Sequence, residues 1–412
     1  MKIVADSKIP YLKGLLEPVA QEVLYVPGSE ITNDVVRDAQ VLLTRTRTRC
    51  DKALLEGSAV EFIGTATIGT DHIDLDYCRS RGIKVVNAPG CNAPAVAQWV
   101  HATILQWIKA CSPPKIGGVR GGMTKSDGYS QGESHTPQSL PPLRLSGTSP
   151  LAGEEDSSPS LREQLDINRP LTLGIVGVGH VGSIVARWAQ QLGYRVLLND
   201  PPLAECCARE SGIVDRGSRI EVLSPLPSSL SLEKTLPSPL YPLTLLQQEC
   251  DIITFHTPLT RDGDHPTWHL CDEAFLNGLN RCSLIINAAR GAVCDNEALL
   301  RWNGDVALDC WEGEPAINAE LLDKAFVATP HIAGYSLQGK QRGTAMILEA
   351  LNRHYGWDIK PVQVNKPFCG AEHVSPEVIL DSYDPLADTA LLKSSPETFE
   401  SQRNTYNLRQ EV

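Results

Sequence analysis

The sequence is short of positive charge, with 37 lysine and arginine residues against 49 aspartate and glutamate residues and a net charge of −12. Nucleic acids and anionic membranes are bound through basic surfaces, so this balance argues against both as partners. The sequence also lacks an apolar run long enough to span a bilayer, and Met1–Asp6 is typical of a first strand rather than of a secretory signal. We therefore expect a soluble, cytoplasmic protein.

Paired cysteine motifs are lacking as well. The twelve cysteines show no paired spacing, which together with the absence of a secretory signal indicates reduced thiols. Cys206 and Cys207 are adjacent but have no C-x-x-C or histidine partners nearby, so we assign no metal site. We interpret Cys91, near the expected substrate, as a small buried thiol. With 412 residues, 42% of them hydrophobic, the chain is long enough for two or three domains.

The most informative segment present is Leu173–Gly182. A short apolar run ends in Gly177-x-Gly179-x-x-Gly182, and Asp200 follows at the end of a second apolar run. This layout is typical of a strand–turn–helix that binds a dinucleotide, although a glycine-rich turn without a ligand is the alternative. Gly177 permits the tight turn, Gly179 lets backbone N–H groups approach the pyrophosphate, and Gly182 lets the helix pack closely. Asp200 can accept hydrogen bonds from both ribose hydroxyls and would repel a 2′-phosphate, which favours NAD over NADP.

Three polar residues further along the chain indicate an enzyme. Arg290, Glu314 and His331 each follow a short apolar run that predicts a strand, and ligands of open α/β sheets lie outside the carboxyl ends of the strands. An arginine fork can hold a substrate carboxylate, and a histidine can take a hydroxyl proton as hydride leaves the carbon. A neighbouring carboxylate would orient that histidine and raise its pKa. Taken singly, the three also fit a strand-end ion pair, a solvated turn residue and a loop histidine.

At these positions the chain resembles the D-2-hydroxyacid dehydrogenase family. The family motifs Asn-x-x-Arg-Gly, Asp-x-x-x-x-Glu-Pro and Pro-His-x-(Ala/Gly)-Gly match residues 287–291, 309–315 and 330–334. The resemblance implies that Arg290 binds the substrate carboxylate, that His331 is the acid/base and that Glu314 is its partner. It also implies contacts to NAD from Gly177, Gly179, His180, Val181, Gly182, Asp200, Thr257, Asp309 and Gly334.

Further segments resemble the branch of this family that oxidises 4-phospho-D-erythronate at C2 in vitamin B6 biosynthesis. They are residues 62–74, 88–93, 254–259, 311–315 and 331–335, while 382–388 and 399–406 resemble that branch's C-terminal dimerisation region. The resemblance implies a homodimer and a substrate side formed by Arg45, Thr46, Thr67 and Tyr335. Arg45 alternates with Arg47 and Arg49, so an acidic protein can still offer a basic pocket to an anionic substrate. We interpret Arg47 and Arg49 as solvated.

The alternation of strands and helices predicts an α/β protein with two doubly wound parallel-sheet domains. We expect a flavodoxin-like substrate domain at 1–98, completed by 333–355, and a Rossmann NAD domain at 99–332. Stretches rich in Gly, Ser and Pro predict irregular insertions at 112–166 and 206–242, and 356–412 should form a small C-terminal dimerisation module. Expected strands are Lys2–Ala5, Glu22–Val26, Val41–Thr44, Glu61–Thr65 and Lys84–Asn87; helices Pro94–Ala110 and Ser336–Tyr355 should cross between the domains and form the hinge.

The resulting hypothesis is an NAD-dependent dehydrogenase acting on a phosphorylated four-carbon 2-hydroxy acid. The alternatives are another D-2-hydroxyacid dehydrogenase, of the phosphoglycerate or hydroxypyruvate type, and an NAD-sensing corepressor or scaffold. The complete set of Arg290, Glu314 and His331 and the acidic charge argue against the corepressor. One departure from the family pattern, a shortened segment Trp302–Asp305, predicts a tighter turn that can displace Glu314.

Overall fold

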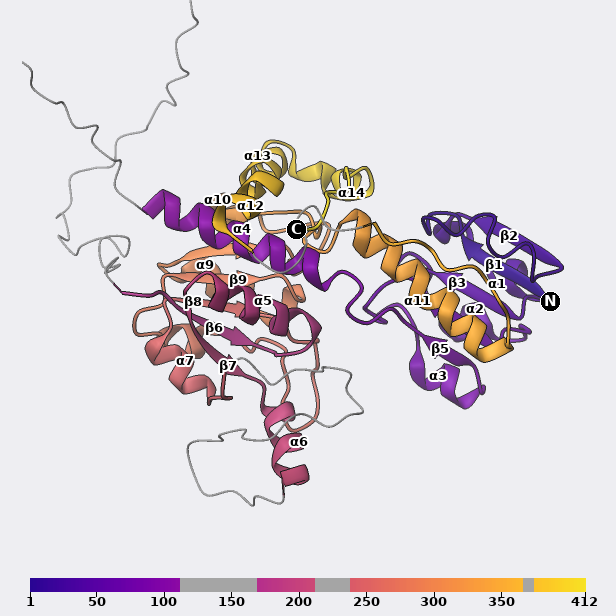
Figure 1. The fold of residues 1–412 in the computed structure, drawn as a ribbon, viewed down its shortest axis with the longest axis horizontal. Helices are drawn as coiled ribbons and strands as arrows, with labels where there is room; N and C mark the ends of the chain where they lie inside the picture. Colours follow the sequence, from indigo (N-terminus) through magenta and orange to yellow (C-terminus); the bar gives the residue numbers. More distant parts are fainter. Residues whose placement is uncertain (112–168, 212–237, 366–373) are drawn as a thin grey trace, which may run out of the picture.

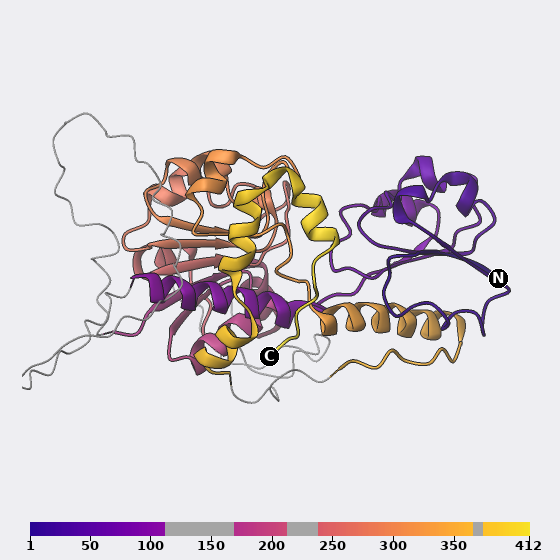
Figure 2. The ribbon, with the colours of Figure 1, turned by 90° about the horizontal axis from the view of Figure 1, so that it is seen from above.

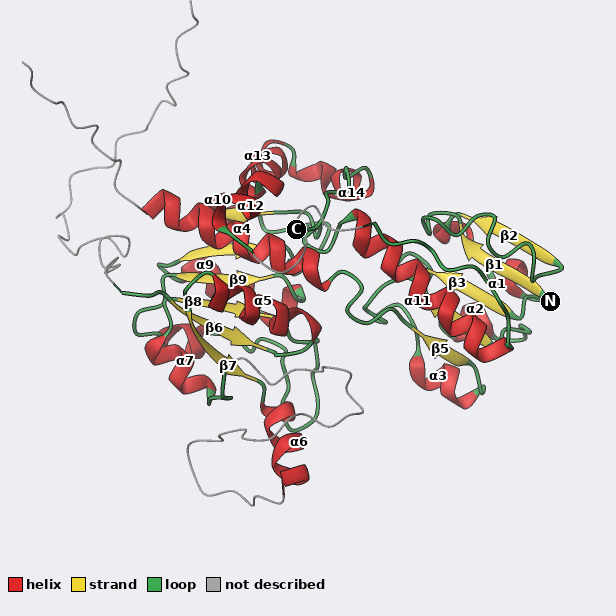
Figure 3. Cartoon of the chain, viewed as in Figure 1, coloured by secondary structure: helices red, strands yellow, loops and turns green. Residues whose placement is uncertain are grey.

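Two parallel sheets, each in its own α/β unit, dominate the computed structural model (Figures 1 and 3). The structure describes residues 1–111, 169–211, 238–365 and 374–412. The expected insertion at 112–166 and most of that at 206–242 lie outside these ranges. Within them, no helix is both long enough and apolar enough to cross a membrane.

The first unit has a five-stranded sheet in the order β2-β1-β3-β4-β5, the order of flavodoxin-like folds. The central strands are buried on both faces, which is why their sequences read as unbroken apolar runs. The strands are β1 (Lys2–Asp6), β2 (Glu22–Val26), β3 (Val41–Thr44), β4 (Phe62–Thr65) and β5 (Lys84–Val86), each within one residue of its expected bounds at either end. The intervening helices are η1 (Gly28–Glu30), α1 (Asn33–Val36), α2 (Lys52–Leu55) and α3 (Leu75–Ser80).

The second unit has a six-stranded sheet in the order β11-β10-β9-β8-β6-β7. Its strands are β6 (Thr172–Val176), β7 (Arg195–Asn199), β8 (Ile252–Phe255), β9 (Leu284–Asn287), β10 (Asp305–Leu308) and β11 (Val327–Ala328). The helices between them are α5 (His180–Gln191), α6 (Pro201–Ser211), α7 (Leu243–Glu249), α8 (Glu273–Asn277), η3 (Gly291–Val293), α9 (Asn296–Arg301) and α10 (Ala319–Lys324). Every pairing in both sheets is parallel, so the predicted α/β class with two doubly wound sheets is confirmed.

The stretch expected to be irregular from residue 206 is partly regular. Helix α6 continues to Ser211, and Leu240 forms a single parallel bridge to Leu198 in β7. Leu240 is also buried at 3% exposure, because it fills the edge of the sheet next to β7. The prediction of an irregular stretch was therefore wrong at both ends, since residues 206–211 are helical and Leu240 is buried at the edge of the sheet.

Two long helices cross between the units, as the sequence predicts. Helix α4 (Ala93–Cys111) leaves the first unit and packs on α5 of the second, burying Trp99 and Trp107. Helix α11 (Leu337–Tyr355) returns and packs under the first sheet through Ile347, Leu348 and Leu351. Both views show α11 running along the first unit and α4 along the second (Figures 1 and 2).

The last described segment packs on the second unit of the same chain. Helices α12 (Pro376–Ser382) and α13 (Pro385–Ser394) contact α4, and α13 also contacts the edge strand β11. At that edge, Thr389 Oγ1 accepts a 3.0 Å hydrogen bond from the N–H of Ala328. After η4 (Pro396–Thr398), helix α14 (Phe399–Asn404) reaches the first unit, where Arg47 contacts Glu400 and Asn404 (Figure 2). The segment thus touches both units.

Candidate active site

The glycine turn has the geometry that its spacing predicts. Gly177, at the end of β6, has a φ of +89°, and a Cβ there would lie 2.8 Å from the backbone of His256. A Cβ on Gly182 would lie 2.0 Å from the carbonyl oxygen of Gly177, so α5 packs directly on the turn. At Gly179, in contrast, a Cβ would meet nothing within 4 Å. Open space therefore faces the backbone at the N-terminus of α5, where a phosphate would be bound.

A cavity of about 920 Å³ opens at the carboxyl ends of β6, β7 and β8. Its lining includes the expected cofactor residues Gly177, Gly179, Asp200 and Thr257. The Oγ1 atom of Thr257 is buried and has no hydrogen-bond partner within the described chain. A buried hydroxyl without a partner is costly unless a ligand supplies one, so these residues fit a dinucleotide.

The Asp200 carboxylate is held in place at this cavity. Its Oδ2 accepts a 2.8 Å hydrogen bond from the N–H of Val178, and its Oδ1 accepts a 3.0 Å hydrogen bond from the N–H of Leu203. Because a carboxylate oxygen has more than one acceptor site, both oxygens can still receive a ribose hydroxyl. The first unit reaches this place too, since a Cβ on Gly90 would lie 2.5 Å from the exposed ring of His180. The neighbouring Val181 is half-buried.

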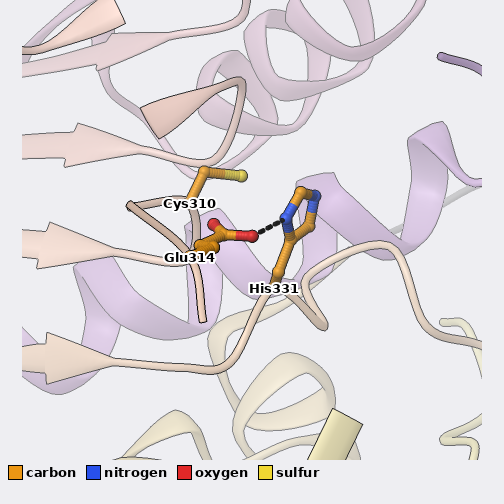
Figure 4. A group of neighbouring side chains, drawn as sticks. All are labelled: Cys310, Glu314 and His331. Atoms are coloured by element: carbon orange, nitrogen blue, oxygen red, sulfur yellow. Dashed lines mark hydrogen bonds and ion pairs between the residues drawn. The ribbon is translucent and has the colours of Figure 1, made fainter. Parts of the chain in front are cut away.

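The central contact of the site joins His331 to Glu314 (Figure 4). His331 Nδ1 and Glu314 Oε2 are 2.8 Å apart, and the two side chains are 30% and 18% exposed. The other oxygen of Glu314 accepts a 2.7 Å hydrogen bond from the N–H of Trp311, which fixes the carboxylate. The expected displacement of Glu314 does not occur. The short turn after α9 is braced instead by Lys324, whose ammonium donates to the carbonyl of Leu299 at 2.6 Å.

Asp309 supports this pair from behind. It is 1% exposed, and its Oδ1 accepts hydrogen bonds from Thr329 Oγ1 at 2.6 Å and from the N–H of Ile332 at 2.7 Å. Its backbone carbonyl accepts from the N–H of His331 at 2.9 Å. His331 has a φ of +57°, which a non-glycine residue adopts only when its surroundings hold it there. The structure therefore places Asp309 as an anchor of the histidine loop, and a contact of Asp309 with the cofactor stays a prediction.

The surroundings favour the protonated imidazole of His331. Burial alone would lower the pKa of His331, but the Cys310 sulfur and the Glu314 carboxylate outweigh it and hold that pKa well above its ordinary value. Burial likewise opposes ionisation of Glu314, yet its hydrogen bond to His331 lowers the Glu314 pKa on balance. The sulfur of Cys310, which was not predicted to be part of the site, lies within 4.8 Å of a ring nitrogen of His331 and a carboxylate oxygen of Glu314 (Figure 4).

Arg290 projects toward the first unit. Its Nε and Nη2 donate to Asp71 Oδ2 at 3.3 and 3.2 Å, and its Nη1 donates to the carbonyl of Ala289 at 2.8 Å. The first unit approaches so closely that a Cβ on Gly69 would lie 2.4 Å from the guanidinium. The Arg290 side chain is 32% exposed and that of Asp71 is 71% exposed. An anionic carboxylate thus occupies the fork that the sequence assigns to the substrate carboxylate.

The expected substrate-side residues fall into two groups. Thr67 Oγ1 lies 2.7 Å from Thr65 Oγ1 at the end of β4, and Thr46 is exposed just beyond β3. Tyr335 is part of a basic cluster that also includes Arg45, Lys340 and Arg403. Lys340 and Arg403 were not predicted.

The alternating arginines differ in their partners. Arg47 pairs with Glu400 and Arg49 pairs with Asp51 at 2.9 Å, so both have carboxylate partners on the surface. Arg45 instead donates to the backbone carbonyl of Lys8 at 3.1 Å. Arg45 therefore differs from Arg47 and Arg49, because its partner is a backbone carbonyl and not a carboxylate.

The end of the described chain fixes the loop that carries His331. Buried Arg409 donates to the carbonyls of Ile332 at 3.1 Å and Ala95 at 3.0 Å, and also to that of Ala333. Its guanidinium therefore joins the histidine loop to the start of α4. The predicted residue Gly334 follows at once, and a Cβ there would lie 2.0 Å from Asn92 Nδ2.

A second contact ties the same segment to α11. Glu411, which is 1% exposed, accepts from Arg342 at 2.5 and 2.7 Å and from Ser336 Oγ at 2.6 Å. Ser336 is the N-cap of α11. The tail thus contacts both crossing helices next to the site.

Comparisons with known proteins agree with this arrangement. Residues 3–365 match the family model described as D-isomer specific 2-hydroxyacid dehydrogenase, catalytic domain. The chain is 39% identical to an erythronate-4-phosphate dehydrogenase of Bacteroides thetaiotaomicron, over 100% of this chain and 97% of that protein. It is 36% identical to an erythronate-4-phosphate dehydrogenase of Escherichia coli O157:H7, over 86% of this chain and 74% of that protein.

Solved structures of lower identity share the fold. A D-lactate dehydrogenase from Aquifex aeolicus, complexed with NAD and lactic acid, has a TM-score of 0.55 at 21% identity and covers 86% of this chain and 95% of its own. An NAD⁺-bound 3-phosphoglycerate dehydrogenase from Entamoeba histolytica has a TM-score of 0.53 at 22% identity and covers 89% of this chain and 99% of its own. These likenesses concern the two-domain architecture.

Proposed function

The chain belongs to the D-isomer specific 2-hydroxyacid dehydrogenase family, and from this premise we propose that it oxidises 4-phospho-D-erythronate at C2 with NAD. The product is 2-oxo-3-hydroxy-4-phosphobutanoate, an intermediate on the route to pyridoxal 5′-phosphate. The observation that carries the chemistry is the pair of His331 and Glu314, 2.8 Å apart beyond the strand ends. The similarity to erythronate-4-phosphate dehydrogenases over the whole chain carries the choice of substrate.

Residues of the second unit would hold the cofactor. The turn Gly177–Gly182 offers backbone N–H groups to the pyrophosphate, Asp200 accepts from the ribose hydroxyls, and Thr257 Oγ1 gains the partner that it lacks. His180, Val181 and Gly334 stay part of this proposed contact set. When bound, NAD supplies the acceptor for the hydride from C2.

The chain's own residues then bind and deprotonate the substrate. Arg290 holds the C1 carboxylate after its contact with Asp71 is broken. His331 takes the proton of the C2 hydroxyl on Nε2, because its Nδ1 is occupied by the Glu314 carboxylate. Glu314 thereby fixes the Nδ1–H tautomer and stabilises the imidazolium that forms. Oxidation requires the neutral imidazole, whereas the raised pKa of His331 favours the reverse direction, in which the protonated histidine returns the proton.

We also propose a cytoplasmic homodimer. The residues at 382–388 and 399–406 resemble a dimerisation region, and the ten cysteines whose side chains the structure describes are free, which is consistent with reducing surroundings. Static light scattering of the purified full-length protein measures the assembly state directly.

A substrate panel tests the function. The purified protein is mixed with NAD and 4-phospho-D-erythronate, 3-phosphoglycerate, D-glycerate or D-lactate, and NADH formation is followed by absorbance. We expect the highest kcat/KM with 4-phospho-D-erythronate. If the enzyme prefers 3-phosphoglycerate or D-lactate, the family assignment still holds but the proposed substrate is wrong. Binding of NAD without turnover of any acid would favour a corepressor instead.

A further inference from the structure

The basic cluster around Tyr335 brings together three cations from distant parts of the chain. Lys340 Nζ lies 3.7 Å from the centre of the Tyr335 ring, and Arg403 Nε donates to the Tyr335 hydroxyl at 3.2 Å. Arg45, just after β3, donates to the carbonyl of Lys8 at 3.1 Å, and its positive charge contributes to lowering the pKa values of Tyr335 and Lys340. The three come from the first unit, the crossing helix α11 and the C-terminal helix α14.

This cluster is not neutralised by acidic side chains. Among the described residues, neither Lys340 nor Arg45 forms an ion pair with a carboxylate. Arg403 pairs with Glu400 at 3.7 Å, but Glu400 also forms an ion pair with Arg47. Burial and the neighbouring arginines lower the pKa of Lys340 to about 8. Like charges this close repel one another, so the arrangement is stabilised when an anion binds among them.

The cluster is continuous with the catalytic residues. Tyr335 follows His331 by four residues on the same loop, and the N–H of Tyr335 donates to the carbonyl of Ile332 at 2.8 Å. On the other side, the positive charge of Arg403 lowers the pKa of Glu314. The proposed binding site for the pyrophosphate of a dinucleotide is the Gly177 turn, in the second unit. The anion that fits here therefore belongs to the substrate.

We propose that Lys340 and Arg403, with Arg45 and the Tyr335 hydroxyl, form the subsite for the terminal phosphate of the substrate. This assignment rests on the proposed function and deepens it, because Lys340 and Arg403 become the residues that select a phosphorylated acid. A phosphate carries up to two negative charges and several acceptor oxygens, which suits three cations and one hydroxyl. Arg290 holds the carboxylate at the other end of the acid.

The test compares a phosphorylated and an unphosphorylated substrate. Lys340→Met and Arg403→Met keep the side-chain length and remove the charge. We expect each to raise KM for 4-phospho-D-erythronate by roughly 10- to 100-fold, the value of a charge-assisted hydrogen bond, and to change kcat/KM for D-erythronate far less. Lys340→Arg should restore most of the affinity, because it returns the cation. Arg353→Met is the matched control, since Arg353 also lies on α11 but pairs with Glu349 at 2.7 Å on the exposed face.

A binding measurement separates this proposal from the function. Inorganic phosphate is titrated calorimetrically into the NAD-loaded protein, and thermal unfolding of each variant checks that it is folded. We expect phosphate binding in the wild type and its loss in both methionine variants. If the wild type binds phosphate through Lys340 and Arg403 but does not oxidise 4-phospho-D-erythronate, the subsite stands and the proposed substrate fails. If the wild type oxidises it and both folded variants keep the KM, the subsite is wrong.

Discussion

Replacing Glu314 by glutamine tests whether that carboxylate sets the protonation of His331. Oxidation requires a neutral His331, so kcat/KM should rise with pH through the His331 pKa and level off above it. In the wild type this pKa is raised well above its ordinary value, which places the rise at correspondingly higher pH. Glutamine keeps the shape and removes the charge, so the rise should move to lower pH.

The size of the shift follows from the contact. A hydrogen bond to a charged group at 2.8 Å contributes about 1.5–3 kcal/mol, and 1.36 kcal/mol corresponds to one pKa unit, so the rise should move by roughly 1–2 pH units. The same linkage affects stability. Because the folded-state pKa of His331 is raised, its stabilising contribution is complete below the unfolded-state pKa and is lost as pH increases through the folded-state value. Glu314→Gln should therefore lower Tm more at acidic than at alkaline pH.

The assay is initial-rate NADH formation over a series of buffers of constant ionic strength. Glu312→Gln is a matched control, since Glu312 lies two residues away and pairs with His269 at 2.8 Å instead. That variant should keep the pH profile of the wild type. An unchanged profile in Glu314→Gln, with the protein folded, would refute the role assigned to Glu314.

Three further changes probe the rest of the site. His331→Ala should leave NAD binding nearly intact and lower kcat by roughly 10²–10⁴-fold; near-normal turnover would reduce it to a loop histidine. Asp200→Ala should weaken NAD binding and improve the use of NADP, as measured by the ratio of kcat/KM for the two cofactors; equal use of both by the wild type would contradict the assignment. Asp71→Asn should lower KM for the acid, by no more than about fivefold because exposed ion pairs contribute about 0–1 kcal/mol, whereas a raised KM would mean that Asp71 positions Arg290 for the substrate.

Local sequence patterns predict much of this fold, because buried parallel strands are unbroken apolar runs. Val41–Thr44 and Glu22–Val26 have the predicted bounds, and the two crossing helices begin and end within one residue of theirs. Leu240 shows the limit of such patterns. It lies in a stretch rich in Ser and Pro, and only its bridge to Leu198 makes it part of the sheet edge.

The residues of the site likewise include some that local motifs predict and others that only the packing of distant segments brings together. Arg290, Glu314 and His331 follow predicted strands in motifs that can be read from the sequence, so their types and order are visible in advance. Asp71 pairs with Arg290 across 219 positions, and Arg403 reaches Tyr335 across 68. No local pattern encodes such contacts, because they depend on how the two units and the C-terminal helices pack. Lys340 could have been predicted from the sequence, because it is a cation on the first turn of the helix that follows the catalytic loop.

The contacts of Arg409 and Glu411 have a consequence for synthesis of the chain. A ribosome has made both sheets, the glycine turn and every predicted catalytic residue by the time it reaches residue 336. The carbonyls of Ile332 and Ala333 and the N-cap of α11 still lack partners that are translated 75 to 77 residues later. A nascent or truncated chain that stops before Arg409 therefore carries the motifs of a dehydrogenase without the residues that hold the catalytic loop, so premature termination should yield an inactive protein rather than a weakly active one.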